Sequence, residues 1–259
     1  MENIITSREN PAIKQIVKLS NSAKFRRELG LFVLEGLRLC RDAALSGHTL
    51  KSVYFTEAFY DAHPQDLKIL KEKSETSFLV SSSVMEKMSD TVNSQGVIAL
   101  CEIPKFPKTL GEGFYVGLEN ISNPSNLGAI SRSAEAFGAK GLVLFGTTCD
   151  PYSPKSLRAG MGALLRLPVL SFSDFDEVKV ACEAVGKKTF SAVVDEDAER
   201  LTECEKPENS LLIIGNEANG ITKETAQKSY KRITIPMSGR AESLNAASAA
   251  AVLIWEFTK

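Results

Sequence analysis

The spacing of apolar residues divides the chain into two series of alternating strands and helices. In the first series, short runs of β-branched and aromatic residues predict strands, and amphipathic stretches between them predict helices. The predicted strands are 31–34, 53–56, 78–80 and 97–101, and the predicted helices are 11–19, 37–45, 65–73 and 84–88. Because the two kinds of element alternate, a small α/β domain is expected here.

A segment rich in proline and glycine, Glu102–Gly113, follows the first series and is expected to be a linker. After it, strands are predicted at 114–118, 142–145, 169–171, 189–194, 211–214 and 232–236, and helices at 127–137, 154–165, 175–185, 223–229 and 243–257. This alternation favours a mostly parallel sheet with helices on both faces. We therefore expect an α/β protein with two domains, residues 1–105 and residues 106–259.

Composition limits the classes of protein to consider. Of 259 residues, 43% are hydrophobic and 24% are charged, and the formal net charge is −1. These values are typical of a globular protein and unlike those of one that coats nucleic acid by bulk charge. No apolar run reaches the roughly 18 residues that span a bilayer, and the first residues do not resemble a secretory signal. Five scattered cysteines indicate reduced thiols, so a cytoplasmic protein is expected, and two isolated histidines predict no metal site.

Basic residues are slightly concentrated near the N-terminus. Residues 1–50 contain eight Lys/Arg against five Asp/Glu, and Lys24, Arg26 and Arg27 are clustered. A surface that binds RNA would have to be local, and this cluster is the candidate. A solvated helix face is the alternative.

Three polar loops each follow a predicted strand, at the sheet edge where open α/β sheets bind ligands. Their sequences are NPSNLG at 123–128, GNEANG at 215–220 and IPMSGRAESLN at 235–245. No G-x-G-x-x-G or P-loop lysine pattern is present, so a nucleotide-like ligand would be held by backbone groups and by Asn216, Ser243 and Asn245. Arg132, about two turns into the helix after the first loop, could point toward the other two. Each loop alone is compatible with an ordinary turn, and the three together favour a site without identifying its ligand.

Together, the segments NPSNLGAISRSAEAFGA, LLIIGNEANGI and ITIPMSGRAESLNAASAAAVLIWE resemble the three motifs of the SpoU (TrmH-type) branch of the SPOUT RNA methyltransferases, in order and spacing. The resemblance covers roughly residues 114–259, and FVLEGLRLCRDAALSG is similar to the substrate-binding domain of rRNA-modifying members. It implies a sheet whose C-terminal segment makes a deep trefoil knot, a rare exception to unknotted topology. It also implies methyl transfer from S-adenosyl-L-methionine to a ribose 2′-hydroxyl of RNA, with 23S rRNA favoured by the extra domain.

The resemblance further assigns residues to roles. Arg132 matches the proposed catalytic arginine, and its polar companions are Asn126, Ser243 and Asn245. The positions that line the cofactor are Gly215, Glu217, Ile235, Met237 and Leu244. An arginine guanidinium holds its proton too strongly to make a good base. Arg132 is therefore expected either to stabilise the developing alkoxide or bind the adjacent phosphate, or, against that difficulty, to act as the base. Family members are homodimers that pack through the last helix, so a homodimer is expected.

Other functions stay open at this point. The RNA could be tRNA, or the chain could be a catalytically silent RNA-binding protein of the same fold. Intact Arg132, Ser243 and Asn245 favour an enzyme. A small-molecule or nucleotide enzyme on a doubly wound sheet is a further alternative, which the basic cluster in the N-terminal domain weakly disfavours. None of the five cysteines lies in the three loops, which disfavours methylation of a base carbon through a cysteine adduct.

Overall fold

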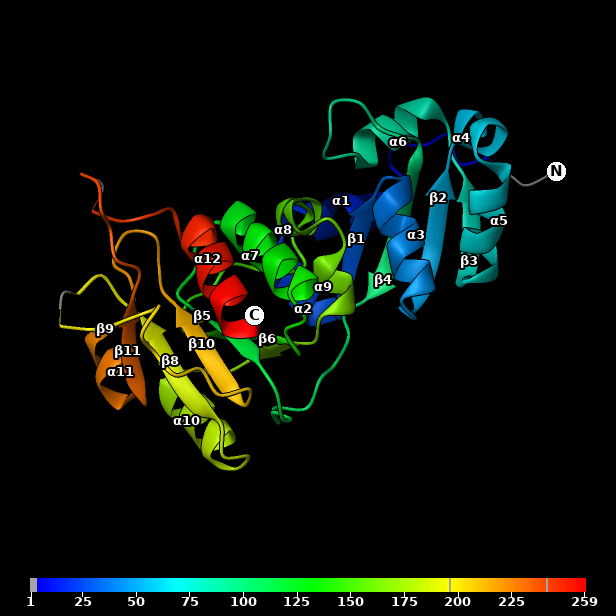
Figure 1. The fold of residues 1–259 in the computed structure, drawn as a ribbon. Helices are drawn as coiled ribbons and strands as arrows, with labels where there is room; N and C mark the ends of the chain where they lie inside the picture. The colour runs from blue at the N-terminus through cyan, green and yellow to red at the C-terminus, as the bar shows by residue number, and fades with distance from the viewer. Residues whose placement is uncertain (1–3, 196, 241) are drawn as a thin grey trace. The chain divides into compact units, whose positions relative to one another are not determined.

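The chain folds into two units that do not divide it at a single point. A computed structural model describes residues 4–195, 197–240 and 242–259. Unit 1 comprises Met1–Lys105 and Asp150–Leu165, and unit 2 comprises Phe106–Cys149 and Arg166–Lys259 (Figure 1). The segment Asp150–Leu165, called the excursion, therefore leaves unit 2 to complete unit 1.

Unit 1 is built on a four-stranded mixed sheet with the order β1-β4-β2-β3. Strand β4 is antiparallel to β1 and β2, whereas β2 and β3 are parallel. The strands are β1 (Leu31–Glu35), β2 (Leu50–Phe55), β3 (Ser74–Leu79) and β4 (Val97–Glu102). The helices are α1 (Pro11–Asn21), α2 (Ala23–Leu29), α3 (Leu37–Leu45), α4 (Glu57–Ala62), α5 (Pro64–Glu72) and α6 (Ser82–Met88), with α8 (Pro154–Gly160) and α9 (Ala163–Arg166) in or at the end of the excursion.

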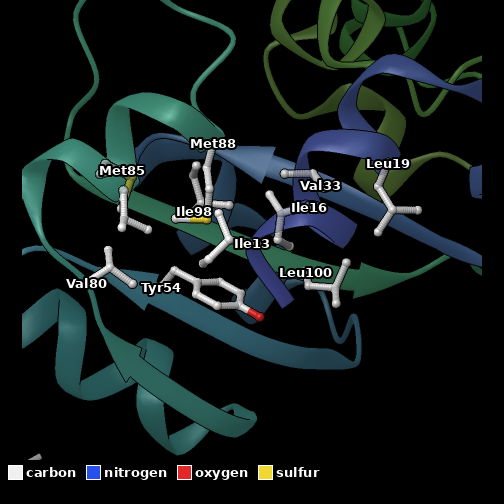
Figure 2. Close-up of a cluster of buried hydrophobic side chains, with 11 residues drawn as sticks. Ile13, Ile16, Leu19, Val33, Tyr54, Val80, Met85, Met88, Ile98 and Leu100 are labelled. Carbon is white, nitrogen blue, oxygen red and sulfur yellow. The ribbon is translucent and has the colours of Figure 1, made fainter. Parts of the chain in front are cut away.

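The core of unit 1 follows from the apolar spacing of α1. The Asn10 side chain accepts a hydrogen bond from the Ala12 N–H (2.9 Å), and Pro11 occupies the first turn, so the helix begins where the sequence predicts. Three apolar residues of α1 then fall on one face and are fully buried. They pack with strand residues and α6 in a single cluster (Figure 2), which includes Ile13, Ile16, Leu19, Val33, Tyr54, Met85, Met88, Ile98 and Leu100.

Helix α2 buries a residue that was expected to be on the surface. Arg26 is only 4% exposed, and its Nε donates to Asp150 Oδ2 of the excursion (2.7 Å). The same guanidinium donates to the carbonyl oxygens of Leu19 and Ser20. This burial disfavours the predicted contact of Arg26 with RNA, because its charge is neutralised inside unit 1.

Unit 2 is built on seven strands in the order β7-β6-β5-β10-β8-β11-β9, and every neighbouring pair is parallel. The strands are β5 (Tyr115–Glu119), β6 (Leu142–Phe145), β7 (Val169–Ser171), β8 (Lys188–Ala192), β9 (Glu199–Arg200), β10 (Ser210–Ile214) and β11 (Lys231–Thr234). Its other helices are α7 (Pro124–Ala136), α10 (Phe175–Glu183), α11 (Lys223–Lys228) and α12 (Ala246–Thr258). Helices α7 and α12 pack together on one face, and α10 covers the other (Figure 1), as the α/β prediction requires.

The strand order brings the last loops of the chain together. Strand β10 lies between β5 and β8, and β11 lies between β8 and β9, so both final strands enter between earlier ones. Because these strands are parallel, their carboxyl ends share one edge of the sheet. The trefoil knot implied by the resemblance stays a prediction.

Two helices differ from their predicted bounds for local reasons. The helix predicted at 154–165 is interrupted because Met161 and Gly162 have φ values of +48° and +91°. The last helix begins at Ala246 because the Asn245 side chain caps it, accepting from the Ala247 N–H (2.9 Å). In the described part of the chain, no helix combines the length and apolar character that crossing a membrane requires.

Candidate functional site

A pocket of about 670 Å³ lies at the carboxyl edge of the unit 2 sheet. Its walls come from the ends of β8, β10 and β11, from the loop 215–221 and from the start of α12. The volume lies within the range of about 300–1,000 Å³ that small-molecule sites occupy. The predicted site residues that line the pocket are Gly215, Glu217, Ile235, Met237, Ser243 and Leu244.

The loop 215–221 is closed so tightly that its first position admits only glycine. A Cβ atom on Gly215 would lie 2.1 Å from the carbonyl carbon of Gly220. Asn216 N donates to Gly220 O (3.0 Å), and Gly220 N donates back to Asn216 O (2.8 Å). The Asn216 side-chain oxygen accepts from the Ala218 N–H (2.9 Å), and its amide nitrogen donates to the carbonyl of Asn120 (2.8 Å). The loop therefore presents a fixed set of backbone groups to the pocket.

A buried carboxylate at the end of β5 anchors the far end of this loop. Glu119 is 4% exposed and lies beneath the start of α11. Its oxygens accept from the Thr222 N–H (2.9 Å), from Thr222 Oγ1 (2.7 Å) and from Thr225 Oγ1 (2.8 Å). Such charge-assisted hydrogen bonds are about twice as strong as neutral ones, so Glu119 fixes where the pocket loop ends.

The first predicted loop holds the second through Glu217. Asn126 is buried, and its amide nitrogen donates to Glu217 Oε1 (2.7 Å), while Ser122 Oγ donates to Oε2 (3.4 Å). Burial raises the pKa of the Glu217 carboxyl, but these hydrogen bonds and those from nearby backbone N–H groups outweigh burial and hold the pKa below its ordinary value. Glu217 is therefore a carboxylate at neutral pH, and the hydrogen bond from the Asn126 amide orients it.

The opposite wall offers apolar side chains to the pocket. Met237 and Leu244 remain 37% and 39% exposed, and Val194, which follows β8, is 74% exposed. Large apolar side chains exposed in a concavity gain free energy when a ligand covers them. The pocket can thus hold a ligand with a flat or alkyl part against this wall and with polar edges toward the loop 215–221.

Three predicted catalytic residues do not line the pocket: Arg132, Asn245 and Asn126, which contacts Glu217 from outside it. Arg132 is exposed on α7, the helix that packs against α12. Asn245 is exposed, and its side chain caps α12. Of the predicted RNA contacts, Lys24 and Arg27 are exposed on α2 of unit 1.

Sequence reasoning missed several residues that build the site. Glu119 ends an otherwise apolar strand, and a charged residue closing such a run was the available signal. Val193, Val194 and Asp195 line the pocket directly after β8, so the rule that ligands bind at carboxyl strand ends would have selected them. The described residues include no group of three or more His, Cys, Asp or Glu side chains that could hold a metal ion.

Two family models match the chain. The SpoU rRNA Methylase family model matches residues 113–255. The MRM3-like substrate binding domain model matches residues 10–99. The site described above lies wholly within the first match.

Relatives match the chain over nearly its whole length. An uncharacterized tRNA/rRNA methyltransferase of Synechocystis is 32% identical over 97% of this chain and 92% of its own. The 23S rRNA (guanosine(2553)-2′-O)-methyltransferase RlmP of Bacillus subtilis is 28% identical, with 97% of each chain covered. The crystal structure of the SpoU methyltransferase AviRb from Streptomyces viridochromogenes, in complex with AdoMet, has a TM-score of 0.87 at 26% identity, covering 96% of this chain and 97% of that one.

Proposed function

Because this chain belongs to the SpoU rRNA methylase family, we propose that it transfers a methyl group from S-adenosylmethionine to a ribose 2′-hydroxyl of ribosomal RNA. The observation that carries the proposal is the pocket at the carboxyl edge of the sheet, walled by the loop 215–221 and by the segment before α12. The AdoMet complex of AviRb and the 2′-O-methyltransferase name of RlmP support this activity.

The residues that line the pocket suit S-adenosylmethionine. The backbone groups fixed by Gly215 and Gly220 can pair with polar edges of an adenine and a ribose. Met237 and Leu244 offer an apolar surface to the flat face of the base. The Glu217 carboxylate can attract the positive charges of the ligand. We assign the cofactor to this pocket, with Ile235 also in its wall.

The chemistry demands alignment and removal of a proton, because a ribose hydroxyl is a poor nucleophile. When bound, S-adenosylmethionine supplies an electrophilic methyl group. We assign Arg132 to the ribose, where its guanidinium either removes the proton or stabilises the developing alkoxide. Asn126 acts by orienting Glu217, Ser243 contributes a hydroxyl to the pocket wall, and Asn245 sets the start of α12.

Within ribosomal RNA, 23S rRNA is the proposed substrate. The 23S rRNA in the name of RlmP and the match of residues 10–99 to a substrate binding domain support this choice. Lys24 and Arg27 on α2 are the proposed RNA contacts of unit 1. With ribosomal RNA as substrate, we place the protein in the cytoplasm. The name of the Synechocystis relative leaves tRNA as the alternative substrate.

We also propose that the protein is a homodimer through α12. Val252 and Trp255 of this helix are 44% and 54% exposed. The Trp255 ring packs on Phe137 at the end of α7, with ring centroids 5.3 Å apart. Sedimentation equilibrium is expected to give twice the chain mass, and Trp255→Glu is expected to shift it toward one chain. A monomeric wild-type protein would contradict the dimer.

Alkaline digestion of labelled RNA tests the reaction. Ribosomal RNA and tRNA from a strain lacking the gene are incubated with the protein and a radioactive methyl donor. A 2′-O-methyl group blocks the internal attack by which alkali cleaves RNA, so label is expected in an alkali-resistant dinucleotide from 23S rRNA. Label in mononucleotides would mean base methylation, and label in tRNA would move the substrate to the alternative. Cofactor binding without any transfer would favour a catalytically silent RNA-binding protein.

A further inference from the structure

Unit 1 contains a cavity of its own, with a volume of about 240 Å³. It opens where β1 ends and α3 begins. The segment 91–95 forms another wall, and Arg158 and Met161 of the excursion complete it. All of these residues belong to unit 1. The cavity shares no lining residue with the cofactor pocket.

The start of α3 gives this cavity donors for an anion. Gly36 caps the helix without a side chain, and its N–H donates to Val97 O (3.0 Å). The Leu37 N–H donates to Gln95 Oε1 (2.9 Å). The next two N–H groups, of Arg38 and Leu39, have no acceptor among the described residues, and both residues line the cavity. Two unpaired donors at a helix N-terminus form a site that favours phosphate.

Two guanidinium groups line the same place, one with an uncompensated charge and one with an unused donor. Arg38 is exposed, and it forms no ion pair or hydrogen bond with the residues that the structure describes. Arg158 Nη2 donates to Asp90 Oδ2 (2.6 Å), but its Nη1 is buried without a partner in the described chain. The carboxylate of Glu35 already accepts from Thr91 Oγ1 and from the Asp90 N–H. Arg158 is thus paired with Asp90 and Glu35 is already hydrogen-bonded, so Arg38 is the cation of the lining that has no carboxylate partner among the described residues.

The remaining lining is suited to a nucleobase. Leu39 and Met161 are apolar, and Asn93 and Gln95 provide amide groups that can both donate and accept. The volume of about 240 Å³ admits one base but no stacked pair of bases, and an unpaired base enters without the cost of a few kcal/mol that opening a base pair requires. Specific RNA recognition by proteins depends mainly on such unpaired bases, read along their edges.

We propose that this cavity binds one unpaired nucleotide of the RNA substrate. Its phosphate lies at the start of α3 against Arg38, and its base lies between Leu39 and the amides of Asn93 and Gln95. The proposal rests on the proposed function, because it takes RNA to be the substrate. It gives unit 1 a defined recognition site remote in sequence from the reacting groups.

A pair of arginines on one helix allows a matched test. Arg38 faces the cavity, whereas Arg41, also on α3, pairs with Asp66 (3.1 Å). The affinity for ribosomal RNA from a strain lacking the gene is measured at several salt concentrations. Arg38→Ala is expected to weaken binding about tenfold and to lower the salt slope by about one, because one phosphate contact is lost. Arg41→Ala is expected to stay within twofold of the wild type, and both variants should bind S-adenosylmethionine normally.

Methylation by the wild-type protein separates the two proposals. If the wild type methylates ribosomal RNA and Arg38→Ala binds it equally well, or Arg41→Ala loses as much affinity, the cavity proposal fails while the function stands. If the wild type methylates no RNA, the proposed function itself fails. The base is tested by in-line probing of the bound RNA. One unpaired nucleotide should be protected by the wild type and exposed with Asn93→Ala, whereas protection confined to duplex RNA would overturn the proposal.

Discussion

Replacing Arg26 by methionine isolates the contribution of the charge buried in unit 1. The substitution keeps an apolar chain of similar length but removes every donor of the guanidinium. Asp150, whose side chain is 12% exposed, then lies almost buried without its counter-ion. The carbonyl oxygens of Leu19 and Ser20 lose their donor at the same time. The excursion is consequently expected to detach from α2 more easily than in the wild type.

The expected loss of stability can be worked out from these contacts. Breaking a buried ion pair by removing one partner costs about 3–5 kcal/mol, and the residual exposure of Asp150 places this case near the lower figure. With a urea dependence of about 2 kcal/mol per M, a loss of about 3 kcal/mol lowers the midpoint by roughly 1.5 M. Hydrogen exchange of the unit 1 amides, measured in urea by mass spectrometry, reports this unit directly, whereas the single tryptophan lies in unit 2.

Arg27→Met is the matched control, because Arg27 lies on the same helix and is exposed. It is expected to change stability by no more than about 0.5 kcal/mol. Adding Asp150→Leu to Arg26→Met should recover part of the loss, since no charge is then buried alone. If Arg26→Met is as stable as the wild type and loses affinity for RNA instead, the reasoning is refuted and Arg26 is an RNA contact after all.

Three further predictions concern unit 2. Arg132→Ala should slow methyl transfer, measured in single-turnover assays, at least about 100-fold and leave cofactor affinity, measured by calorimetry, within a few-fold of the wild type. A loss of cofactor affinity as large as the loss of rate would contradict the assignment of Arg132 to the ribose. Glu119→Gln should weaken cofactor binding about tenfold, or 1.4 kcal/mol, because it weakens the hydrogen bonds that hold Thr222 at the end of the pocket loop. Unchanged affinity would show that Glu119 does not position this loop. Burial lowers the pKa of Lys187 to about 8, so the folded protein loses this proton before the unfolded chain does. The free energy of unfolding of the wild type, measured by urea titration and compared with that of Lys187→Met, should therefore rise from pH 8 to pH 10. Lys188→Met is the control, and the same pH dependence relative to it, or none relative to Lys187→Met, would contradict the prediction.

The sequence predicted best those elements whose ends are marked by local chemistry. The helix expected at 37–45 has those bounds in the structure, because Gly36 separates it from β1. The strands at 142–145 and 169–171 are also confirmed, being short apolar runs between polar turns. Helix α2 was not predicted because its seven residues have too little apolar periodicity, although Ser22, which caps it, was a usable signal.

The candidate site was predictable as far as local pattern reaches. The position of loops at carboxyl strand ends led to the segments 215–220 and 235–245, and the family resemblance selected Gly215, Met237 and Leu244 within them, which do line one pocket. The order of the strands depends on pairing between distant segments, so it could not be derived from spacing. The same holds for Arg26, because a charge cluster in sequence does not reveal that Asp150, far along the chain, neutralises one of its members.

The excursion has a consequence for how the chain is made. A ribosome releases Met1–Lys105 first, but unit 1 lacks Asp150–Leu165 until about 60 further residues have been added. At synthesis rates of about 5–20 residues per second, that interval lasts roughly 3–12 s. During it, Arg26 has no counter-ion, while β5, α7 and β6 of unit 2 have already emerged. Unit 1 therefore cannot be completed until the first segment of unit 2 has been made, and a graft that transfers substrate recognition to another enzyme must carry both segments of unit 1.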